Sequence, residues 1–303
     1  MANANQFSTA CTEMGAHEAC IIYSGLMCQE GALALERQLE QLFGYYQYRR
    51  ITLSIESPGG AIDGLEYILR VIQKWAQEGR AVAVRSTFQC ASAAAFLLAM
   101  GDWGHRRVDR AVFLLFHSAR IEAPSMAGMT AAYSTNLSHV LSSVDRKLLD
   151  VLLEKMLTGS GSVRNLADLV MMRARHVDQN WKQLASDLTT FTSGVDGSRK
   201  PDWLRAVQKW SRLEADPGKL VLELKKHLNL RLQRDIRMDL CEAWVLCLID
   251  EIAGVLDADS VAPEMPVQVI SPESLPDEAV NERAQHTLAG ERIAMRACYS
   301  AVL

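Results

Sequence analysis

The first 120 residues alternate between short apolar segments and longer segments in which apolar residues recur with helical spacing. Short apolar or alternating runs are typical of strands, and apolar recurrence every three to four positions is typical of amphipathic helices. We therefore predict strands at residues 19–23, 50–57, 81–88 and 111–116, and helices at residues 31–43, 64–78 and 91–100. Because strands alternate with helices, the pattern predicts βαβ units and an α/β fold with a mostly parallel sheet.

The rest of the chain is mainly helical in pattern. Residues 126–157 carry one long apolar stripe that ends at the stop signal Thr158-Gly159-Ser160-Gly161. Residues 242–256 are an apolar run that fits either a helix or a strand. The other segments are a polar arm or frayed terminus at 1–18, polar helices at 162–230 with a break at 192–201, and a proline-rich tail after residue 257 with a helical pattern at 277–299.

The overall charge changes this picture little. The chain is 22% charged with a net charge of −4, as in an ordinary soluble protein. Nothing global indicates nucleic acid or an anionic membrane as a partner. Basic residues outnumber acidic ones between Arg199 and Arg237. A solvated helix face is the favoured interpretation of that bias, and a patch for nucleic acid or an acidic partner is the alternative.

Cysteine usage and the terminal sequence favour a cytoplasmic protein. The seven cysteines include no C-x-x-C pair, and the N-terminus lacks the pattern of a secretory signal. No apolar run approaches the roughly 20 residues that a membrane-spanning helix needs. No cluster of potential ligands has the spacing of a zinc site. We therefore expect free thiols, no membrane association, no metal and no cofactor.

Three segments carry candidate chemistry. The turn Ser57-Pro58-Gly59-Gly60 follows a predicted strand, and its backbone N–H groups could stabilise an oxyanion or bind phosphate, with a purely structural turn as the alternative. Ser92 opens a helix among very small residues, either as an N-cap or as a nucleophile whose developing charge the helix N-terminus favours. His117 ends an apolar strand, either as a core residue or as a general base.

Taken together, these segments resemble the ClpP family of self-compartmentalising serine peptidases. QCASAAAFLLAMG resembles the nucleophile segment of the family, SIESPGGAIDG its glycine turn, and VFLLFHSA its V-M-I-H-Q-P segment. A fourth stretch, RDIRMDLCEAWVLCLIDEI, resembles the segment that contains the catalytic aspartate. The resemblance covers about residues 19–160 and 231–256.

The resemblance implies a catalytic triad of Ser92, His117 and Asp235. In this family Ser92 would attack the scissile carbonyl, His117 would transfer the proton, and Asp235 would orient the imidazole. The family's oxyanion donors match the backbone N–H groups of Gly60 and Ala93. An acyl-enzyme on Ser92, later hydrolysed by water, would follow.

The aspartate is assigned less directly than the other two residues. An ungapped match of Glu242-Ala243 and Asp250 to the family pattern selects Asp235, and Asp239 nearby is the alternative. The extra length before this match falls at about residues 162–230, after the segment that corresponds to the family's handle helix.

The implied fold is a ClpP/crotonase-like spiral of ββα units with a mostly parallel sheet, a long handle helix and an additional helical insertion. The expected divisions are an N-terminal arm at 1–18, the core and handle at 19–160, the insertion at 161–230, core completion at 231–256 and a C-terminal extension at 257–303.

The implied function is a serine endopeptidase that acts on peptides or unfolded proteins inside a homo-oligomeric ring, with an AAA+ unfoldase as a candidate partner. The alternatives are a catalytically silent ClpP-like scaffold and a crotonase-type acyl-CoA enzyme. A membrane signal-peptide peptidase relative is weaker, because it would need a Ser–Lys dyad and a membrane anchor.

Overall fold

A computed structural model describes residues 7–15, 18–120, 131–189, 199–213, 215–234 and 237–257. These residues belong to one compact unit, residues 1–261. The helical pattern predicted at 277–299 falls in a second unit, residues 262–303, and lies outside the described residues.

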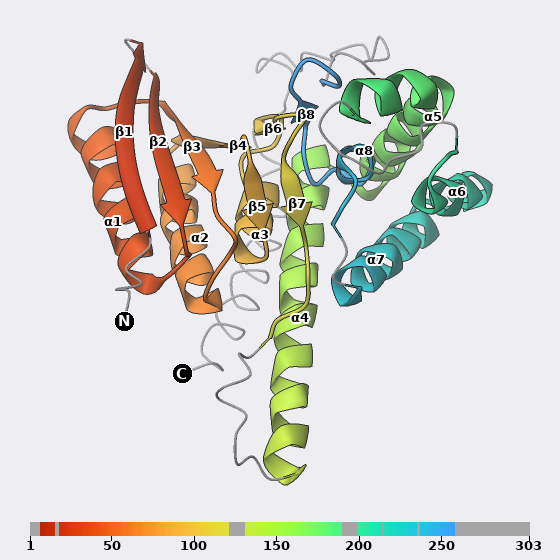
Figure 1. The fold of residues 1–303 in the computed structure, drawn as a ribbon, viewed down its shortest axis with the longest axis horizontal. Coiled ribbons are helices and arrows are strands. Elements are labelled where there is room, and N and C mark those ends of the chain that lie inside the picture. Colours follow the sequence, from red (N-terminus) through yellow and green to blue (C-terminus); the bar gives the residue numbers. More distant parts are fainter. Residues whose placement is uncertain are drawn as a thin grey trace, which may run out of the picture. The chain divides into compact units, whose positions relative to one another are not determined.

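The larger of the two sheets has six strands (Figure 1), in the order β1-β2-β3-β4-β6-β8. Strands β2 to β8 of this sheet run parallel to their neighbours, and β1 pairs antiparallel with β2 at the edge. The predicted α/β fold with a mostly parallel sheet is therefore confirmed. The strands are β1 (Phe7–Gly15), β2 (Glu18–Gly25), β3 (Arg50–Glu56), β4 (Ala81–Ser86), β6 (Arg106–Val108) and β8 (Glu251–Ile252).

Two helices follow the first parallel strands and bury their apolar faces. Helix α1 (Gln29–Leu39), continued by η1 (Glu40–Tyr45), packs against α2 (Ile62–Gln77). The apolar residues of α1 and α2 that were spaced for a helix, such as Leu35 and Leu65, are almost completely buried. The helices predicted at 31–43 and 64–78 are thus confirmed within a few residues.

A second, two-stranded parallel sheet holds the segments with candidate chemistry. It consists of β5 (Gln89–Ala91) and β7 (Phe113–Leu115), and helix α3 (Ala93–Ala99) begins soon after β5. The sequence analysis predicted no strand here, because β5 is only three residues long and lies between the strand expected at 81–88 and the helix expected at 91–100. The three-residue β6 was missed as well, since so short a strand has no measurable period.

The expectation of a frayed N-terminus is wrong for residues 7–15. This segment is β1, and it pairs with β2 from Phe7 opposite Gly25 to Gly15 opposite Glu18. The sequence did not reveal this strand, because an edge strand is stabilised by backbone hydrogen bonds to its one neighbour, here β2.

The predicted insertion is helical. After α4 (Ala131–Ser160) the chain forms α5 (Val163–Thr189), α6 (Asp202–Gln208), the 3-10 helix η3 (Lys209–Leu213) and α7 (Pro217–Gln233). Helix α5 contacts α4, α6, α7 and also α8 (Leu240–Val245), which lies beyond the insertion in sequence. The break predicted at 192–201 falls largely on residues outside the described part of the chain.

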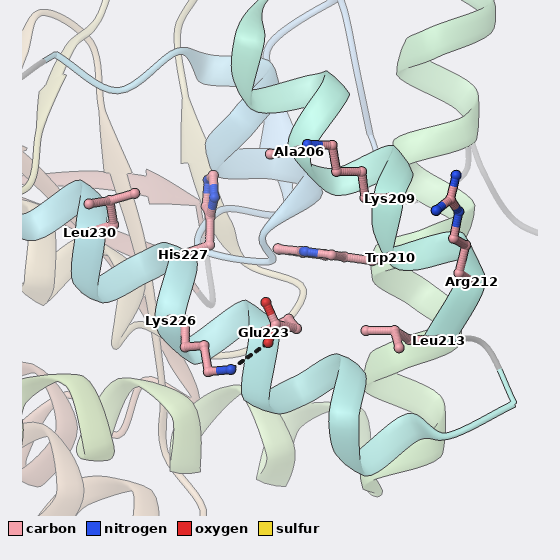
Figure 2. Close-up of a pocket in the computed structure, with 9 residues that line it drawn as sticks. All are labelled: Ala206, Lys209, Trp210, Arg212, Leu213, Glu223, Lys226, His227 and Leu230. Atoms are coloured by element: carbon pink, nitrogen blue, oxygen red, sulfur yellow. Dashed lines mark hydrogen bonds and ion pairs between the residues drawn. The ribbon is translucent and has the colours of Figure 1, made fainter.

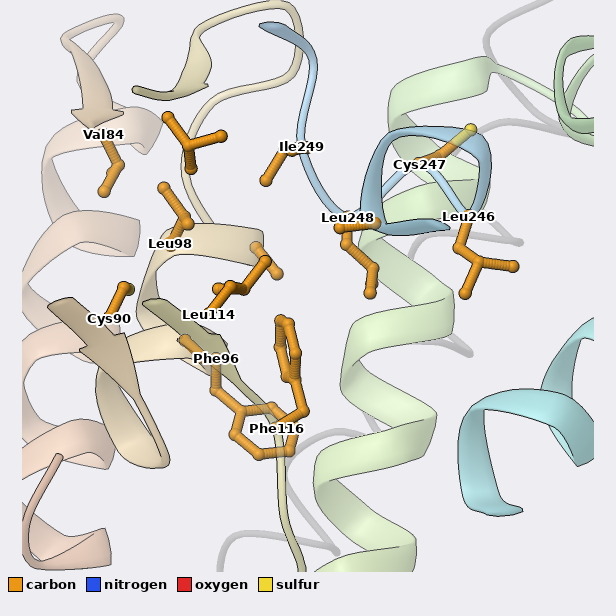
Figure 3. Close-up of a cluster of buried hydrophobic side chains, with 14 of the residues drawn as sticks. Val84, Cys90, Phe96, Leu98, Leu114, Phe116, Leu246, Cys247, Leu248 and Ile249 are labelled. Carbon is orange, nitrogen blue, oxygen red and sulfur yellow. The ribbon is translucent and has the colours of Figure 1, made fainter. Parts of the chain in front are cut away.

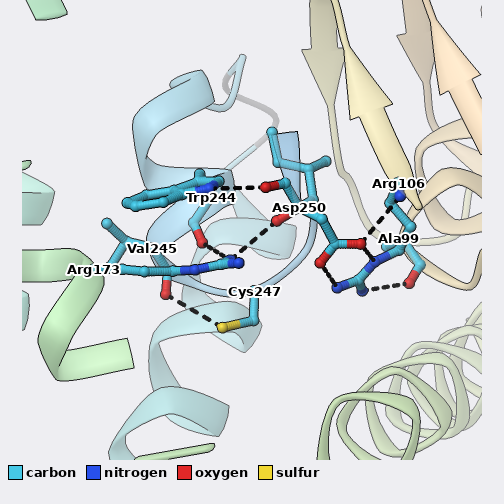
Figure 4. Close-up of polar contacts among 8 residues, drawn as sticks. Ala99, Arg106, Arg173, Trp244, Val245, Cys247 and Asp250 are labelled. Atoms are coloured by element: carbon cyan, nitrogen blue, oxygen red, sulfur yellow. Dashed lines mark hydrogen bonds and ion pairs between the residues drawn. The ribbon is translucent and has the colours of Figure 1, made fainter. Parts of the chain in front are cut away.

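Buried arginines join these parts to the sheet (Figure 4). Arg173 of α5 donates hydrogen bonds to the carbonyls of Trp244 (2.6 Å) and Ile249 (3.2 Å), and its guanidinium lies 4.6 Å from the centre of the Trp244 ring. Arg106 of β6 forms a two-pronged ion pair with Asp250, at 2.8 and 2.6 Å. Helix α5 and strand β8 are therefore fixed to the core by buried polar contacts as well as by apolar packing.

Candidate active site

Ser92 occupies a sharp turn between strand β5 and helix α3. Its φ of 56° and ψ of −129° are unusual for a residue with a side chain, which indicates local backbone strain. The backbone N–H of Ser92 donates to the carbonyl of Leu115 on β7 at 2.7 Å, which fixes the turn. Ser92 occupies the N-cap position of α3, as one interpretation of the sequence expected, but its side chain makes no capping hydrogen bond. The residue is half-buried, which leaves the hydroxyl accessible.

The glycine turn lies directly against Ser92. A Cβ atom added to Gly59 would lie 2.4 Å from the Ser92 Cβ and 2.8 Å from the Ala91 carbonyl oxygen. A Cβ atom on Gly60, whose φ is 154°, would lie 2.1 Å from the carbonyl oxygen of Met27. Both glycines are therefore required by close backbone approach, one to the serine and one to Met27.

Hydrogen bonding orients the Gly60 N–H away from its neighbouring strand. Met27 donates to the Gly59 carbonyl and accepts from the Ala61 N–H, both at 2.8 Å. In a parallel bridge of this kind, the intervening residue directs its own N–H to the opposite side. Within the described part of the chain, neither the Gly60 N–H nor the Ala93 N–H donates a hydrogen bond to protein. Both donors are thus available to an anion.

Glu56, just before the glycine turn, fixes the loop that leads into β5. The sequence analysis did not identify this residue as part of the site. Its carboxylate accepts hydrogen bonds from the N–H groups of Thr87 (2.7 Å), Phe88 (3.0 Å) and Gln89 (3.0 Å). Its neighbour Ser57 pairs with β5, donating to the Gln89 carbonyl at 2.8 Å. A carboxylate immediately before a glycine turn is the only signal that could have indicated this role.

His117 lies at the same edge of the small sheet as Ser92. Ala91 is opposite Leu115 in the β5–β7 pair. Ser92 comes one position after Ala91, and His117 comes two positions after Leu115. Phe116 is buried against Phe96 of α3, with ring centroids 5.4 Å apart (Figure 3). This contact anchors the residue before the histidine to the helix that begins beside the serine.

The His117 ring is held by a neighbouring carbonyl. Its Nδ1 atom lies 2.6 Å from the carbonyl oxygen of Ser118. A carbonyl can only accept, so Nδ1 carries the proton and Nε2 is the basic nitrogen of the neutral ring. Among the described residues, the Ser92 hydroxyl has no hydrogen-bond partner, His117 included; catalytic hydrogen bonds often tighten only when substrate binds.

Asp235 lies outside the described residues, but the chain on both sides of it is described. The Leu232 carbonyl accepts from the Ser118 N–H at 3.0 Å, and the Met238 N–H donates to the Leu114 carbonyl at 2.8 Å. Asp239, the alternative aspartate, caps α8 by accepting from the N–H groups of Cys241 (2.8 Å) and Glu242 (3.2 Å). Burial raises the pKa of Asp239 to about 6.

The described residues contain no group of three or more potential metal ligands, and no helix among them is long and apolar enough to cross a bilayer. A cavity of about 420 Å³ opens between η3 and α7, lined by Trp210, His227 and neighbouring side chains (Figure 2). None of the predicted site residues lines it.

Comparison with known proteins identifies the first half of the chain. Residues 5–152 match the sequence profile of the family described as Clp protease. The matched range contains Gly60, Ser92, Ala93 and His117, whereas Asp235 lies beyond it. No curated protein matches the chain.

Proposed function

Residues 5–152 form a Clp protease family domain, and on this premise we propose that the chain is a serine endopeptidase. The observation that carries the proposal is the strained turn at Ser92, which lies against Gly59, together with the N–H groups of Gly60 and Ala93, which have no acceptor among the described residues. A strained strand-to-helix turn is a recurrent way of exposing a nucleophilic serine.

The proposed reaction proceeds through an acyl-enzyme. Ser92 Oγ attacks the peptide carbonyl while Nε2 of His117 accepts its proton. The N–H groups of Gly60 and Ala93 stabilise the negative charge on the carbonyl oxygen. His117 then protonates the leaving amine, and water hydrolyses the ester by the same steps.

Asp235 is the proposed third member of the triad. Leu232, before it in the sequence, is hydrogen bonded to Ser118, and Met238, after it, is hydrogen bonded to Leu114. Asp239 is less suitable, because its carboxylate is already engaged with two backbone N–H groups of α8. In this role Asp235 would stabilise the imidazolium that forms during attack.

The proposal includes the assembly expected of the family. A homo-oligomeric ring in the cytoplasm would enclose the active sites and admit peptides or unfolded proteins, with an AAA+ unfoldase as candidate partner. The N-terminal half of α4 supports a role in assembly, since apolar Val140 there is 57% exposed. The divisions at residues 161–230 and 231–256 are the proposed insertion and core completion.

A fluorophosphonate probe tests the proposed chemistry directly. The purified full chain should form a covalent adduct, and peptide mapping by mass spectrometry should locate it on Ser92. Heat-unfolded protein is the control and should not react, because an unfolded serine lacks an activating base. A folded chain that does not react, or that reacts at another residue, would contradict the proposal.

Replacing Gly60 by alanine is expected to lower kcat by on the order of 10² to 10³, the usual cost of losing one oxyanion donor. The added Cβ would lie 2.1 Å from the Met27 carbonyl oxygen, so the backbone must move and the N–H with it. The measurement is steady-state cleavage of a fluorogenic peptide.

Gly218→Ala is the matched control for this substitution. Gly218 has an ordinary φ, and the nearest atom to an added Cβ, Asp216 Oδ1, lies at 3.6 Å. This variant should keep wild-type kcat. A Gly60→Ala variant with wild-type kcat would exclude the Gly60 N–H from the oxyanion site.

A further inference from the structure

A buried carboxylate connects the two helices on either side of the segment that contains Asp235. Glu242 of α8 has a side chain with no exposed surface. Its Oε1 atom lies 2.8 Å from Nε2 of His227, and its Oε2 atom accepts from Arg231 at 2.6 Å. Both partners belong to α7, and both are largely buried, at 11% and 15% exposed.

This arrangement fixes the last turns of α7 relative to α8. A buried carboxylate is stable only when its oxygens are paired, so the three side chains are constrained to one geometry. His227 has a second support, because its ring packs edge-on against Trp210 at 5.6 Å. The end of α7 is therefore held from both sides.

The end of α7 in turn holds the residues around His117. Leu232, adjacent to Arg231, accepts from the Ser118 N–H at 3.0 Å through its carbonyl. Further along the chain, Arg237 donates to the Val112 carbonyl at 3.0 Å. The segment from Val112 to Ser118 is thus hydrogen bonded at both ends, to Leu232 in the last turn of α7 and to Arg237 before α8.

The contact reaches the imidazole itself through Ser118. The N–H of Ser118 donates to the Leu232 carbonyl, and the carbonyl oxygen of Ser118 lies 2.6 Å from His117 Nδ1. A displacement of the α7 end would move Ser118 and would rotate the ring that hydrogen bonds to it. We infer that Glu242, with Arg231 and His227, is a positioning residue for His117, an inference that rests on the proposed peptidase function.

Glu242→Gln is the decisive variant, because it preserves shape and removes the charge that pairs with Arg231. Peptide hydrolysis should lose at least tenfold in kcat, KM should stay within twofold, and the rate of fluorophosphonate labelling at Ser92 should fall in parallel. Glu223→Gln is the matched control: it makes the same change on α7 in an exposed pair with Lys226 and should keep wild-type kcat.

Arg231→Lys extends the test, since it retains the charge but loses the planar guanidinium. It should give a smaller loss of kcat than Glu242→Gln. Wild-type kcat in a folded Glu242→Gln variant would overturn the inference. If Glu242→Gln does not fold, wild-type kcat in Arg231→Lys and in His227→Gln would overturn it.

Histidine ¹⁵N spectra of the Ser92→Ala protein separate this inference from the proposed function. The His117 signals, assigned by their loss in His117→Gln, should change with Glu242→Gln and not with Glu223→Gln. Unchanged His117 signals would refute the positioning role even if the chain is a peptidase. A wild-type chain that does not react with the probe would refute the peptidase function and leave this spectroscopic result standing.

Discussion

Ser92→Ala is expected to lower kcat for peptide hydrolysis by on the order of 10⁶, as loss of the nucleophile does in other triad peptidases. The substitution removes the atom that forms the acyl-enzyme, and no other group at the site replaces it. Stability should be unaffected, because the Ser92 hydroxyl makes no hydrogen bond among the described residues and does not cap α3. The measurements are fluorogenic peptide cleavage and thermal unfolding of the same preparation.

A serine on the insertion provides the control. Ser211 is exposed on η3 and lines no part of the candidate site, so Ser211→Ala should match the wild type in both measurements. Residual activity is expected for Ser92→Ala, because the oxyanion donors and the binding surface remain. Retention of a tenth or more of wild-type kcat would show that hydrolysis does not pass through Ser92.

Arg106→Met is expected to reduce the free energy of unfolding by about 3–5 kcal/mol, the usual result of breaking a buried ion pair. Arg106 has no exposed side-chain surface and pairs with Asp250, whose side chain is 4% exposed. The substitution leaves the Asp250 carboxylate buried without its main partner. For a domain of this size the melting temperature should fall by roughly 6–20 °C.

The adjacent residue supplies a control on the same strand. Arg107 pairs with Glu251 at 3.3 Å, but its side chain is 51% exposed. Arg107→Met should therefore cost less than about 1 kcal/mol. Chemical denaturation of both variants measures the difference, and equal losses would show that burial of the Arg106 pair is not what stabilises this strand.

The sequence predicted strands β2, β3 and β4 of the main sheet and the helices between them, because those elements have a local signature. Apolar periodicity marked β3, β4, α1 and α2, and an ordered set of short motifs marked Gly60, Ser92 and His117. Strand β1 was missed because its partner, β2, supplies the hydrogen bonds that stabilise it. A tertiary partner of this kind leaves no periodic pattern in the segment itself.

The supporting contacts of the site could not be predicted, because they join residues far apart in sequence. Glu56 accepts hydrogen bonds from the N–H groups of a loop that lies 31 to 33 residues later in the sequence. From the sequence, Glu242 resembles any other helix residue. Only the structure shows that it pairs with His227 and Arg231 of α7. The role of Glu242 depends on how α7 folds, and the sequence motifs outside α7 give no information about that.

The Arg106–Asp250 pair joins residues 144 positions apart. Arg106 also donates to the Ala99 carbonyl at 3.0 Å, and so completes the end of the helix that starts beside Ser92. While the chain is being synthesised, this arginine lacks the Asp250 carboxylate until that residue has left the ribosome. The serine segment therefore reaches its final support only after residues 161–230 have been translated. An unfinished chain would lack a completed active site, so the proposed peptidase would be delayed until its own synthesis is nearly over.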